Sequence, residues 1–319
     1  MLRKIGVLTS GGDSPGLNAA IRAVTRTALA NGIEVVGIRD GYRGLVEGNY
    51  IPFERSSVSE TIAKGGTILG SARLPEFSDI EVQKKGVEML RKHNIDAVVV
   101  IGGDGTYRGA DALTKLGVNC IALPGTIDND VEGTDYTIGF DTALNTIVDC
   151  VDKLRDTSNS HHRCSVVEVM GNRCGDLAIY SGISCGAEIL ITPETGYDEE
   201  AVLDKLRYLE SCGKTHAIVI VSEKVCDVKA LADKISKSTG FAGRATILGH
   251  IQRGGVPTPS DRVLASRMGE KAVELLVQGV GGQCIGIRNN QMVAYPIEEC
   301  VSMPRSNRKA FYRLFDRLV

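Results

Sequence analysis

The chain has 319 residues, of which 43% are hydrophobic and 24% charged, and its formal net charge is −2. This composition is typical of a globular protein with one large domain or two smaller ones. The lack of a basic surplus argues against nucleic acid or an anionic membrane as a partner, and no apolar run reaches the length of a membrane span. Nine cysteines without a CxxC pair predict a reducing, cytoplasmic location, with neither a disulfide framework nor a zinc site.

Short apolar runs alternate with longer amphipathic runs along the chain. Residues 4–10 are predicted to form a strand, and the helix after them is expected to use Ser14 as N-cap, Pro15 as its first residue and Gly32 as its end. A second helix is predicted at 105–117. Five further apolar runs are predicted strands: 33–40, 95–103, 118–125, 163–171 and 215–223.

The C-terminal third carries three more patterns. A helix capped by Ser260 is predicted from one apolar face: Leu264, Met268, Ala272, Leu275 and Leu276. Residues 284–295 resemble a hairpin that turns at Asn289 and Asn290. The last residues, 304–319, permit a helix with four apolar residues on one face: Phe311, Leu314, Phe315 and Leu318.

Strands that are apolar throughout, alternating with helices, predict a parallel sheet covered on both faces. Ligands of such sheets bind beyond the carboxyl ends of the strands. Glycines cluster at these predicted ends: Gly11, Gly12, Gly102, Gly103, Gly105, Gly125 and Gly171.

Two of the glycine motifs have the features of phosphate sites. Residues 9–16, TSGGDSPG, place two glycines before a predicted helix, which suits either an anion site or a tight turn, and Leu17-Asn18 excludes a Walker A loop. Residues 101–106, IGGDGT, surround Asp104 with glycines, so that backbone N–H groups can bind phosphate while the acid holds Mg²⁺. The second motif also occurs in NAD kinases and lipid kinases.

Residues 124–130, PGTIDND, crowd two acids and an amide behind a buried strand. One interpretation is a solvated turn. The other is phosphoryl transfer to an alcohol, in which Asp128 and Asp130 divide the roles of base and electrostatic support and Thr126 donates to phosphate.

Four basic residues lie near strand ends and suit a phosphate dianion if the fold gathers them: Arg163, Arg244, His250 and Arg253. The other histidines, among them His216, are interpreted as ordinary surface or boundary residues.

Seven motifs follow one another in order from residue 5 to about residue 290: TSGGDSPGLNAAIR, GGTILGSAR, IGGDGT, PGTIDND, IGFDTALNT, EVMG and LGHIQRGG. Together they resemble the bacterial ATP-dependent 6-phosphofructokinase family. The resemblance implies Mg²⁺-dependent transfer of the γ-phosphoryl group of ATP to the 1-hydroxyl of fructose 6-phosphate by a homotetramer. It also implies two α/β/α three-layer domains with largely parallel sheets that face a central cleft. The expected ATP domain is 1–138 with about 251–301, and the substrate domain is 139–250 with about 302–319.

The resemblance also assigns roles to residues. Asp128 is the implied general base, assisted by Thr126 and Arg73, and Asp104 the implied metal ligand. The implied ATP contacts are Gly12, Arg73, Leu74, Gly103, Asp104, Gly105 and Thr106. The implied fructose 6-phosphate contacts are Thr126, Ile127, Asp128, Met170, Gly171, Asn172, Glu223, His250, Ile251, Gln252 and Arg253, with Arg163 and Arg244 supplied by a neighbouring subunit. Pyrophosphate-dependent relatives carry Asp and Lys where this chain has Gly105 and Gly125, which predicts ATP as donor.

Two positions depart from the family pattern. Asn172 stands where the family has an arginine facing the transferred group, so we expect either a slow enzyme or compensation by Arg173. A site for ADP as activator and phosphoenolpyruvate as inhibitor is implied at a subunit interface, and Cys212, at a commonly basic position, predicts weakened affinity. The matching effector residues are Arg22, Arg26, Arg55, Arg155, Gly186, Glu188 and Lys214.

Two other functions stay open at this point. GGDGT alone also permits a kinase for another sugar phosphate or for NAD, although TIDND and HIQRGG disfavour NAD. A non-catalytic sensor of nucleotide and sugar phosphate is favoured only by Asn172, whereas Asp104 and Asp128 argue for catalysis.

Overall fold

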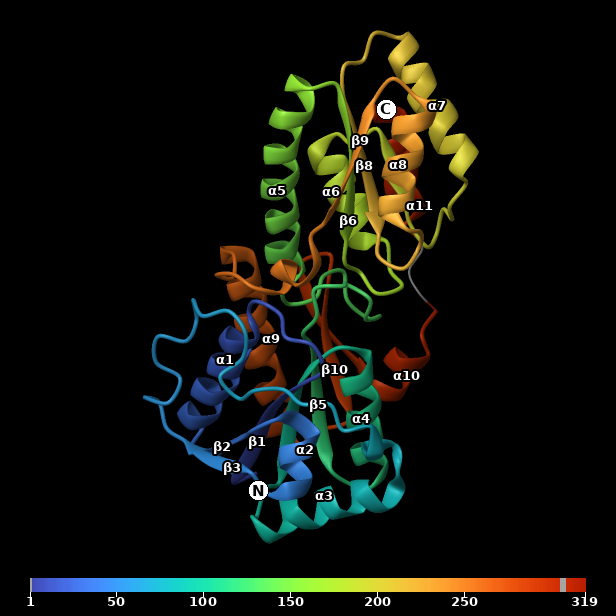
Figure 1. Cartoon of the computed structure of the whole chain (residues 1–319). Coiled ribbons are helices and arrows are strands. Elements are labelled where there is room, and N and C mark those ends of the chain that lie inside the picture. Colours follow the sequence, from blue (N-terminus) through green and yellow to red (C-terminus); the bar gives the residue numbers. More distant parts are fainter. Residues whose placement is uncertain (1, 305–307) are drawn as a thin grey trace. The chain divides into compact units, whose positions relative to one another are not determined.

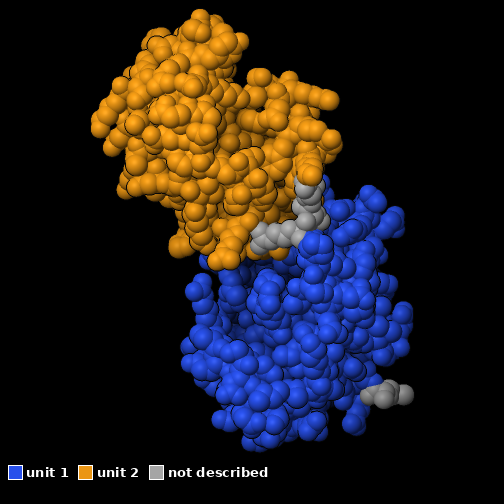
Figure 2. Space-filling view, turned by 90° about the vertical axis from the view of Figure 1, so that its right-hand side faces the viewer, with its two compact units in different colours: residues 1–127, 131–142, 253–305 blue, residues 128–130, 143–252, 306–319 orange. Residues whose placement is uncertain are grey.

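The computed structural model describes residues 2–304 and 308–319. The described chain forms two compact units (Figure 2). Unit 1 contains 2–127, 131–142 and 253–304, and unit 2 contains 128–130, 143–252 and 308–319. The chain therefore enters unit 2 for three residues, Asp128–Asp130, before it returns to unit 1.

Unit 1 is built on a seven-stranded sheet in the order β11-β10-β5-β4-β1-β2-β3. The two edge pairs, β2 with β3 and β10 with β11, are antiparallel, and the remaining pairs are parallel. The strands are β1 (Lys4–Ser10), β2 (Glu34–Ile38), β3 (Tyr50–Phe53), β4 (Ala97–Gly102), β5 (Asn119–Pro124), β10 (Gln283–Arg288) and β11 (Gln291–Pro296).

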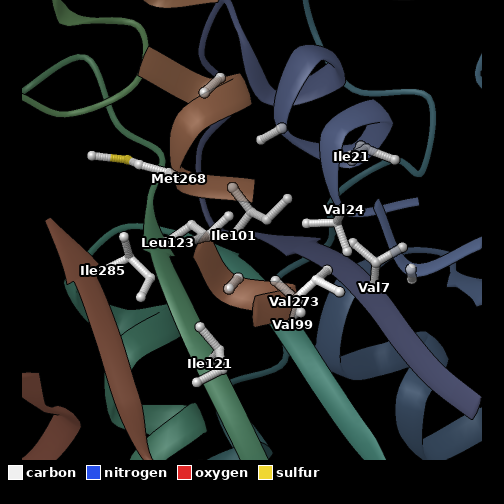
Figure 3. Packing of buried hydrophobic residues seen from close by; sticks show 14 of the residues in the cluster. Val7, Ile21, Val24, Val99, Ile101, Ile121, Leu123, Met268, Val273 and Ile285 are labelled. Atoms are coloured by element: carbon white, nitrogen blue, oxygen red, sulfur yellow. The ribbon is translucent and has the colours of Figure 1, made fainter. Parts of the chain in front are cut away.

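Helices cover both faces of this sheet (Figure 1). α1 (Leu17–Ala30) and α9 (Pro259–Val277) pack on one face, where the predicted apolar stripe of α9 is buried as expected. α2 (Gly41–Glu47), α3 (Ile80–Lys92), α4 (Asp104–Lys115) and α10 (Ile297–Ser302) belong to the other face, and the short helix η1 (Pro75–Ser78) precedes α3. Figure 3 shows the first interface, in which Ile21 and Val24 of α1 and Met268 and Val273 of α9 lie over Val7, Val99, Ile101, Ile121, Leu123 and Ile285.

Unit 2 is built on a four-stranded parallel sheet in the order β7-β8-β6-β9. Its strands are β6 (Arg163–Val169), β7 (Ile189–Ile191), β8 (Ala217–Ser222) and β9 (Ala242–Ile247). α7 (Glu199–Ser211) and α8 (Val228–Ser238) bury one face, and α5 (Phe140–Ser160) and α6 (Asp176–Cys185) lie on the other side (Figure 1). The short helix η2 (Gly249–Arg253) follows β9. The predicted α/β class with largely parallel sheets is therefore confirmed.

Two predicted helix starts are wrong. α1 begins at Leu17 with Gly16 as N-cap at φ 106°, because the Ser14 hydroxyl donates instead to the Ile138 carbonyl at 3.0 Å. α9 begins at Pro259 with Thr258 as N-cap, and the Thr258 hydroxyl accepts from the Asp261 N–H at 3.3 Å. In α1 a distant acceptor occupies the expected capping hydroxyl, and in α9 a threonine two residues before the expected serine caps the helix.

The C-terminal patterns have mixed outcomes. The hairpin is confirmed, with Asn289 and Asn290 both at positive φ, as a two-residue turn between twisted strands requires. α11 (Lys309–Leu318) packs Phe311 against Tyr180 of α6 and buries Phe315. Leu314 and Leu318 are 41% and 64% exposed, so the apolar face of this helix is buried only in part. Residues 305–307 of the expected helix lie outside the described residues.

The sequence predicted no disulfide framework, and one disulfide occurs among the described residues. Cys284 of β10 and Cys300 of α10 form a disulfide. The hairpin and the helix that follows it return the chain to β10, which brings two buried cysteines 16 residues apart together in a way that spacing alone does not indicate. In the part of the chain that the structure describes, no helix has both the length and the apolar character needed to cross a membrane.

Candidate active site

The glycine motifs of unit 1 meet at the carboxyl ends of three adjacent parallel strands. The register pairs Ser10 of β1 with Gly102 of β4 and Gly102 with Pro124 of β5. The segments that begin at Gly11, Gly103 and Gly125 therefore leave the sheet side by side. The three motifs are far apart in the sequence, and the parallel pairing of their strands brings them together.

Gly102 and Thr106 fix the packing of β1, β4 and α4 at this edge of the sheet. A Cβ added at Gly102 would lie 2.3 Å from both the Ser10 carbonyl oxygen and the Thr106 Oγ1, so this position accepts only glycine. Thr106 is buried, and its hydroxyl donates to the Ser10 carbonyl at 3.0 Å. The Thr106 side chain, expected to contact ATP, is thus used to join β1 to α4.

Gly105 lies in open space at the first turn of α4. It is exposed, and a Cβ added there would have no neighbour within 4 Å. The first N–H groups of a helix lack partners within the helix and carry a partial positive charge, so this turn suits the negative oxygens of a phosphate chain.

Asp104, the first residue of α4, is the predicted metal ligand. Its carboxylate pairs with Arg108 one turn later, with Oδ2 3.0 Å from Nε, and its side chain is 51% exposed. No cluster of three or more potential metal-binding side chains occurs among the described residues. Mg²⁺ in nucleotide sites commonly takes one or two carboxylates together with substrate phosphates and water, so this single accessible carboxylate fits such an ion.

The loop before η1 is tied to the same edge. The Ser71 hydroxyl donates to the Gly11 carbonyl at 2.5 Å, and the Thr9 hydroxyl donates to the Gly70 carbonyl at 2.8 Å. These bonds hold the residues that follow, exposed Arg73 and half-buried Leu74, next to the first glycine motif.

Arg253 lies at this edge too. Its guanidinium carbon is 3.5 Å from the position that a Cβ of Gly12 would take. The structure thus brings this predicted fructose 6-phosphate contact to the glycine motif of unit 1.

The segment PGTIDND runs from unit 1 into unit 2. A Cβ added at Gly125 would lie 2.6 Å from Leu17 Cδ2 and 3.0 Å from Ile101 Cγ2, so the position is crowded. The Thr126 carbonyl accepts from the Thr137 hydroxyl at 2.6 Å. Ile127 is buried, which restricts its predicted contact with substrate to the backbone.

Asn129 and Asp130 anchor this segment within unit 2. Asn129 is buried at φ 51°, and its amide donates to Asp176 Oδ2 at 2.7 Å. Asp176 in turn forms an ion pair with Arg308 at 2.8 Å. Asp130 Oδ2 accepts from the Asn172 amide at 3.4 Å. The contacts of these two residues therefore fix the chain directly after the half-buried Asp128.

The carboxyl ends of β6 and β8 contribute the next group. Gly171 has φ 138°, and a Cβ there would lie 2.3 Å from the Cys174 carbonyl, so only glycine fits between Met170 and Asn172. The Asn172 N–H donates to Glu223 Oε1 at 2.8 Å, which joins two predicted substrate contacts. Burial, helped by the negative charges of Glu223 and Asp227, raises the pKa of Glu168 on β6.

The motif HIQR divides between exposed and buried roles. His250 and Ile251 are exposed. Gln252 is fully buried: its Oε1 accepts from the Met170 N–H at 3.1 Å, and its Nε2 donates to the Gly249 carbonyl at 3.0 Å. Because both ends of the amide bond to protein, Gln252 shapes the backbone at Met170 rather than offering its side chain to substrate.

Arg163 lies at the amino end of β6, and Arg244 of β9 lies at the level of Ser165, two residues further along. Met170 follows the last residue of β6. A seven-residue strand is roughly 20 Å long. Within one chain these arginines are therefore far from Met170, Asn172 and Glu223.

The predicted effector residues form one group in each unit. In unit 1, burial and the neighbouring charges of Arg22 and Arg55 lower the pKa of the Arg26 guanidinium. In unit 2, Arg155 donates to the Cys185 and Gly186 carbonyls, and Lys214 pairs with buried Glu188.

Three contributors were missed by sequence reasoning. His216 joins the unit 2 effector group, since its Nε2 lies 3.5 Å from Arg155 Nη1 and burial lowers its pKa. Lys224 donates from Nζ to Asn172 Oδ1 at 2.8 Å, and Asp176 holds Asn129. A basic residue after a strand-end glutamate was the only indication of Lys224, and surface lysines at such places are common.

A parallel sheet whose glycine turns gather at one edge, with an acidic segment leaving the same edge, defines a phosphate-handling α/β protein. The family model described as Phosphofructokinase matches residues 4–276. The chain belongs to the phosphofructokinase family.

Relatives of known sequence and structure agree with this assignment. The chain is 55% identical over the full length of both proteins to the ATP-dependent 6-phosphofructokinase of Aliivibrio fischeri strain MJ11. It superposes with a TM-score of 0.90 on the phosphofructokinase of Pichia pastoris in the T-state, at 33% identity, and of 0.88 on that of Saccharomyces cerevisiae, at 34%. The two matches cover 100% and 99% of this chain, but only 37% and 48% of the Pichia pastoris and Saccharomyces cerevisiae chains.

Proposed function

We propose that the protein is an ATP-dependent 6-phosphofructokinase, which transfers the γ-phosphoryl group of ATP to the 1-hydroxyl of fructose 6-phosphate. The observation that carries the proposal is the course of residues 124–130. This segment starts at the glycine turns of unit 1, and Asn129 and Asp130 then fix it to side chains of unit 2 that include Asn172. Asp128 directly precedes these two anchored residues. The full-length identity to named enzymes of this activity supports the same conclusion.

In the proposed mechanism the Asp128 carboxylate accepts the proton of the 1-hydroxyl while the oxygen of that hydroxyl bonds to the γ-phosphorus. The bond between the γ-phosphorus and the β–γ bridging oxygen breaks in the same step, and ADP leaves. The N–H groups at Gly103–Gly105 and the side chains of Arg73 and Arg253 bind the phosphate chain. Mg²⁺ held by Asp104 would neutralise phosphate charge when bound. Glu223 and His250, with the backbone at Met170 and Gly171, bind the sugar phosphate.

The assembly is part of the proposal. A homotetramer would let Arg163 and Arg244 complete the sugar phosphate site of a neighbouring subunit. Arg163 is the first residue of β6 and Arg244 pairs with Ser165, whereas Met170 follows the last residue of β6. The basic groups around Arg26 and Arg155 would bind the phosphates of ADP or phosphoenolpyruvate. Cytoplasmic location is proposed on the same family grounds.

The test is a coupled assay with ATP, Mg²⁺ and fructose 6-phosphate on wild type, Asp128→Ser and Asp130→Ser. We expect Asp128→Ser to lower kcat by about 10²–10⁴-fold, the usual contribution of a general base. Asp130→Ser, an equal change two residues away, should cost much less. Equal losses in both variants would refute the assignment of the base. Turnover only with pyrophosphate, or only with another sugar phosphate, would refute the proposed substrates.

A further inference from the structure

Two residues of unit 2 that are bonded to each other have positive φ angles, which asparagine tolerates and lysine does not. Asn172, after β6, has φ 58°, and Lys224, after β8, has φ 67°. This left-handed region disfavours residues with a Cβ, and glycine adopts it without penalty. Side chains that are kept at such positions are candidates for a functional role. Here the two side chains are bonded to each other, with Lys224 Nζ 2.8 Å from Asn172 Oδ1.

The chemistry of the neighbours fixes the orientation of the Asn172 amide. An ammonium group can only donate hydrogen bonds, and a carboxylate can only accept them. The atom facing Lys224 is therefore the amide oxygen, and the NH₂ group faces Asp130 Oδ2 at 3.4 Å. Two groups therefore fix the orientation of the amide: the Lys224 ammonium attracts the oxygen, and the Asp130 carboxylate repels it. Removing the ammonium group leaves only the repulsion from Asp130.

The ammonium group also changes the strength of the amide as a donor. A positively charged group beside the amide oxygen draws electron density from the nitrogen, which makes the N–H groups stronger hydrogen-bond donors. These N–H bonds lie at the segment that contains Asp128, since Asp130 accepts one of them. A neutral amide activated in this way acquires part of the effect of a cation.

We propose that Lys224 is a positioning residue for phosphoryl transfer. It orients and polarises the Asn172 amide, so that Asn172 donates to an oxygen of the phosphoryl group as negative charge develops there. The inference rests on the proposed function and deepens it. It also replaces the expected compensation by Arg173, which is exposed, with one by Lys224.

The backbone strain provides a variant that separates catalysis from folding. Lys224→Gly removes the ammonium group and relieves the positive φ, so its melting temperature should equal or exceed that of wild type. We expect kcat to fall about 10-fold, less than the roughly 10²-fold loss from removing the donor itself in Asn172→Gly. KM for both substrates should stay within about twofold, because the donor acts on developing charge.

Two further variants complete the test. Lys224→Arg, which keeps the charge and the donor, should retain most of kcat, whereas Lys224→Asn, uncharged but tolerant of the left-handed backbone, should behave like Lys224→Gly. The double variant Lys224→Gly/Asn172→Gly should lose no more than Asn172→Gly alone, because both changes remove one interaction.

An unchanged kcat in Lys224→Gly and Lys224→Asn, or multiplicative losses in the double variant, would overturn the inference. So would a drop in kcat that appears only with a lower melting temperature. Wild type is assayed first: absence of turnover with ATP and fructose 6-phosphate refutes the proposed function itself, whereas normal turnover with insensitive Lys224 variants refutes only the role of Lys224.

Discussion

Gly105 and Gly125 both bear on the choice of phosphoryl donor, but their surroundings differ. A side chain at Gly105 would enter open space at the first turn of α4, whereas one at Gly125 would collide with Leu17 and Ile101. A change at Gly125 therefore tests packing as well as chemistry. Gly105 is the position where donor selectivity can be tested without disturbing the fold.

We expect Gly105→Asp to raise KM for ATP by at least about 10-fold and to leave the melting temperature unchanged or higher. A carboxylate there repels the phosphate chain, yet an acid in the first turn of a helix is favoured by the helix dipole, worth roughly 0.3–1 kcal/mol. Steady-state kinetics and thermal unfolding check the two parts. The control is Gly105→Ala, which adds a Cβ without charge and should change KM for ATP little. Equal KM values for the two variants would contradict the electrostatic explanation.

Single residues show where sequence reasoning reached its limit. Thr106 and Gln252 were both expected to touch ligands, and both use their side chains to hold protein backbone. Their partners are 96 and 82 residues away in sequence. A polar side chain beside a motif has the right chemistry for either role, and the choice depends on which distant backbone group the fold places next to it. Asp104 and Gly105 are exposed, so both remain accessible to a ligand, as their motif predicted.

At the scale of elements, the strands were predictable and the helix starts were not. β1, β4 and β5 are apolar over nearly their whole length because both faces of the sheet are covered. A helix cap depends on one hydroxyl, and several serines or threonines compete for it. Ser14 does not cap α1 because its hydroxyl donates to the buried carbonyl oxygen of Ile138, 124 residues away. β3 and β7 are only four and three residues long, and β9 is interrupted by Gly243, Arg244 and Thr246, so none of the three has a long apolar run and all three were missed.

Asp261, near the start of α9, gives an element-scale prediction about pH. It is buried, and it accepts from the Gly139 N–H at 2.9 Å and from the Thr142 N–H at 2.8 Å. Burial outweighs these bonds and raises the pKa of Asp261 to about 6. A folded-state pKa above the unfolded value, about 3.9, means that the folded state binds the proton more tightly. The contribution of Asp261 to stability is therefore greatest below pH 4 and declines as the pH rises to about 6.

The decline should reach about 3 kcal/mol at most, from roughly two pKa units. It is measured as the difference in free energy of unfolding between wild type and Asp261→Asn, by urea titration from pH 4 to pH 7. Thr142→Ala, which removes one donor to the carboxylate, should raise the pKa of Asp261 further and shift the decline to higher pH. A difference between wild type and Asp261→Asn that is constant with pH, or that grows as the pH rises, would show that Asp261 is not perturbed in this direction.

At the scale of the whole molecule, one chain presents the predicted sugar phosphate contacts in two places. Met170, Asn172 and Glu223 lie at the carboxyl ends of β6 and β8, whereas Arg163 and Arg244 lie toward the amino ends of β6 and β9. Strand length separates these positions, and no side-chain rotation spans roughly 20 Å. If the arginines bind the same sugar phosphate, they must come from another copy of the chain.

Mixing two inactive variants tests this sharing directly. Asp128→Ser lacks the proposed base and Arg163→Ser lacks a phosphate ligand, so each alone should be nearly inactive at low fructose 6-phosphate. When the two are unfolded together and refolded, about a quarter of the sites in a random homo-oligomer combine an intact Asp128 with a neighbour's intact Arg163. Activity should return to about that fraction of wild type. Refolding Asp128→Ser with Asp128→Asn, which cannot complement each other, is the control. If the Asp128→Ser and Arg163→Ser mixture stays as inactive as this control, each site takes both residues from one chain, and the shared site is wrong.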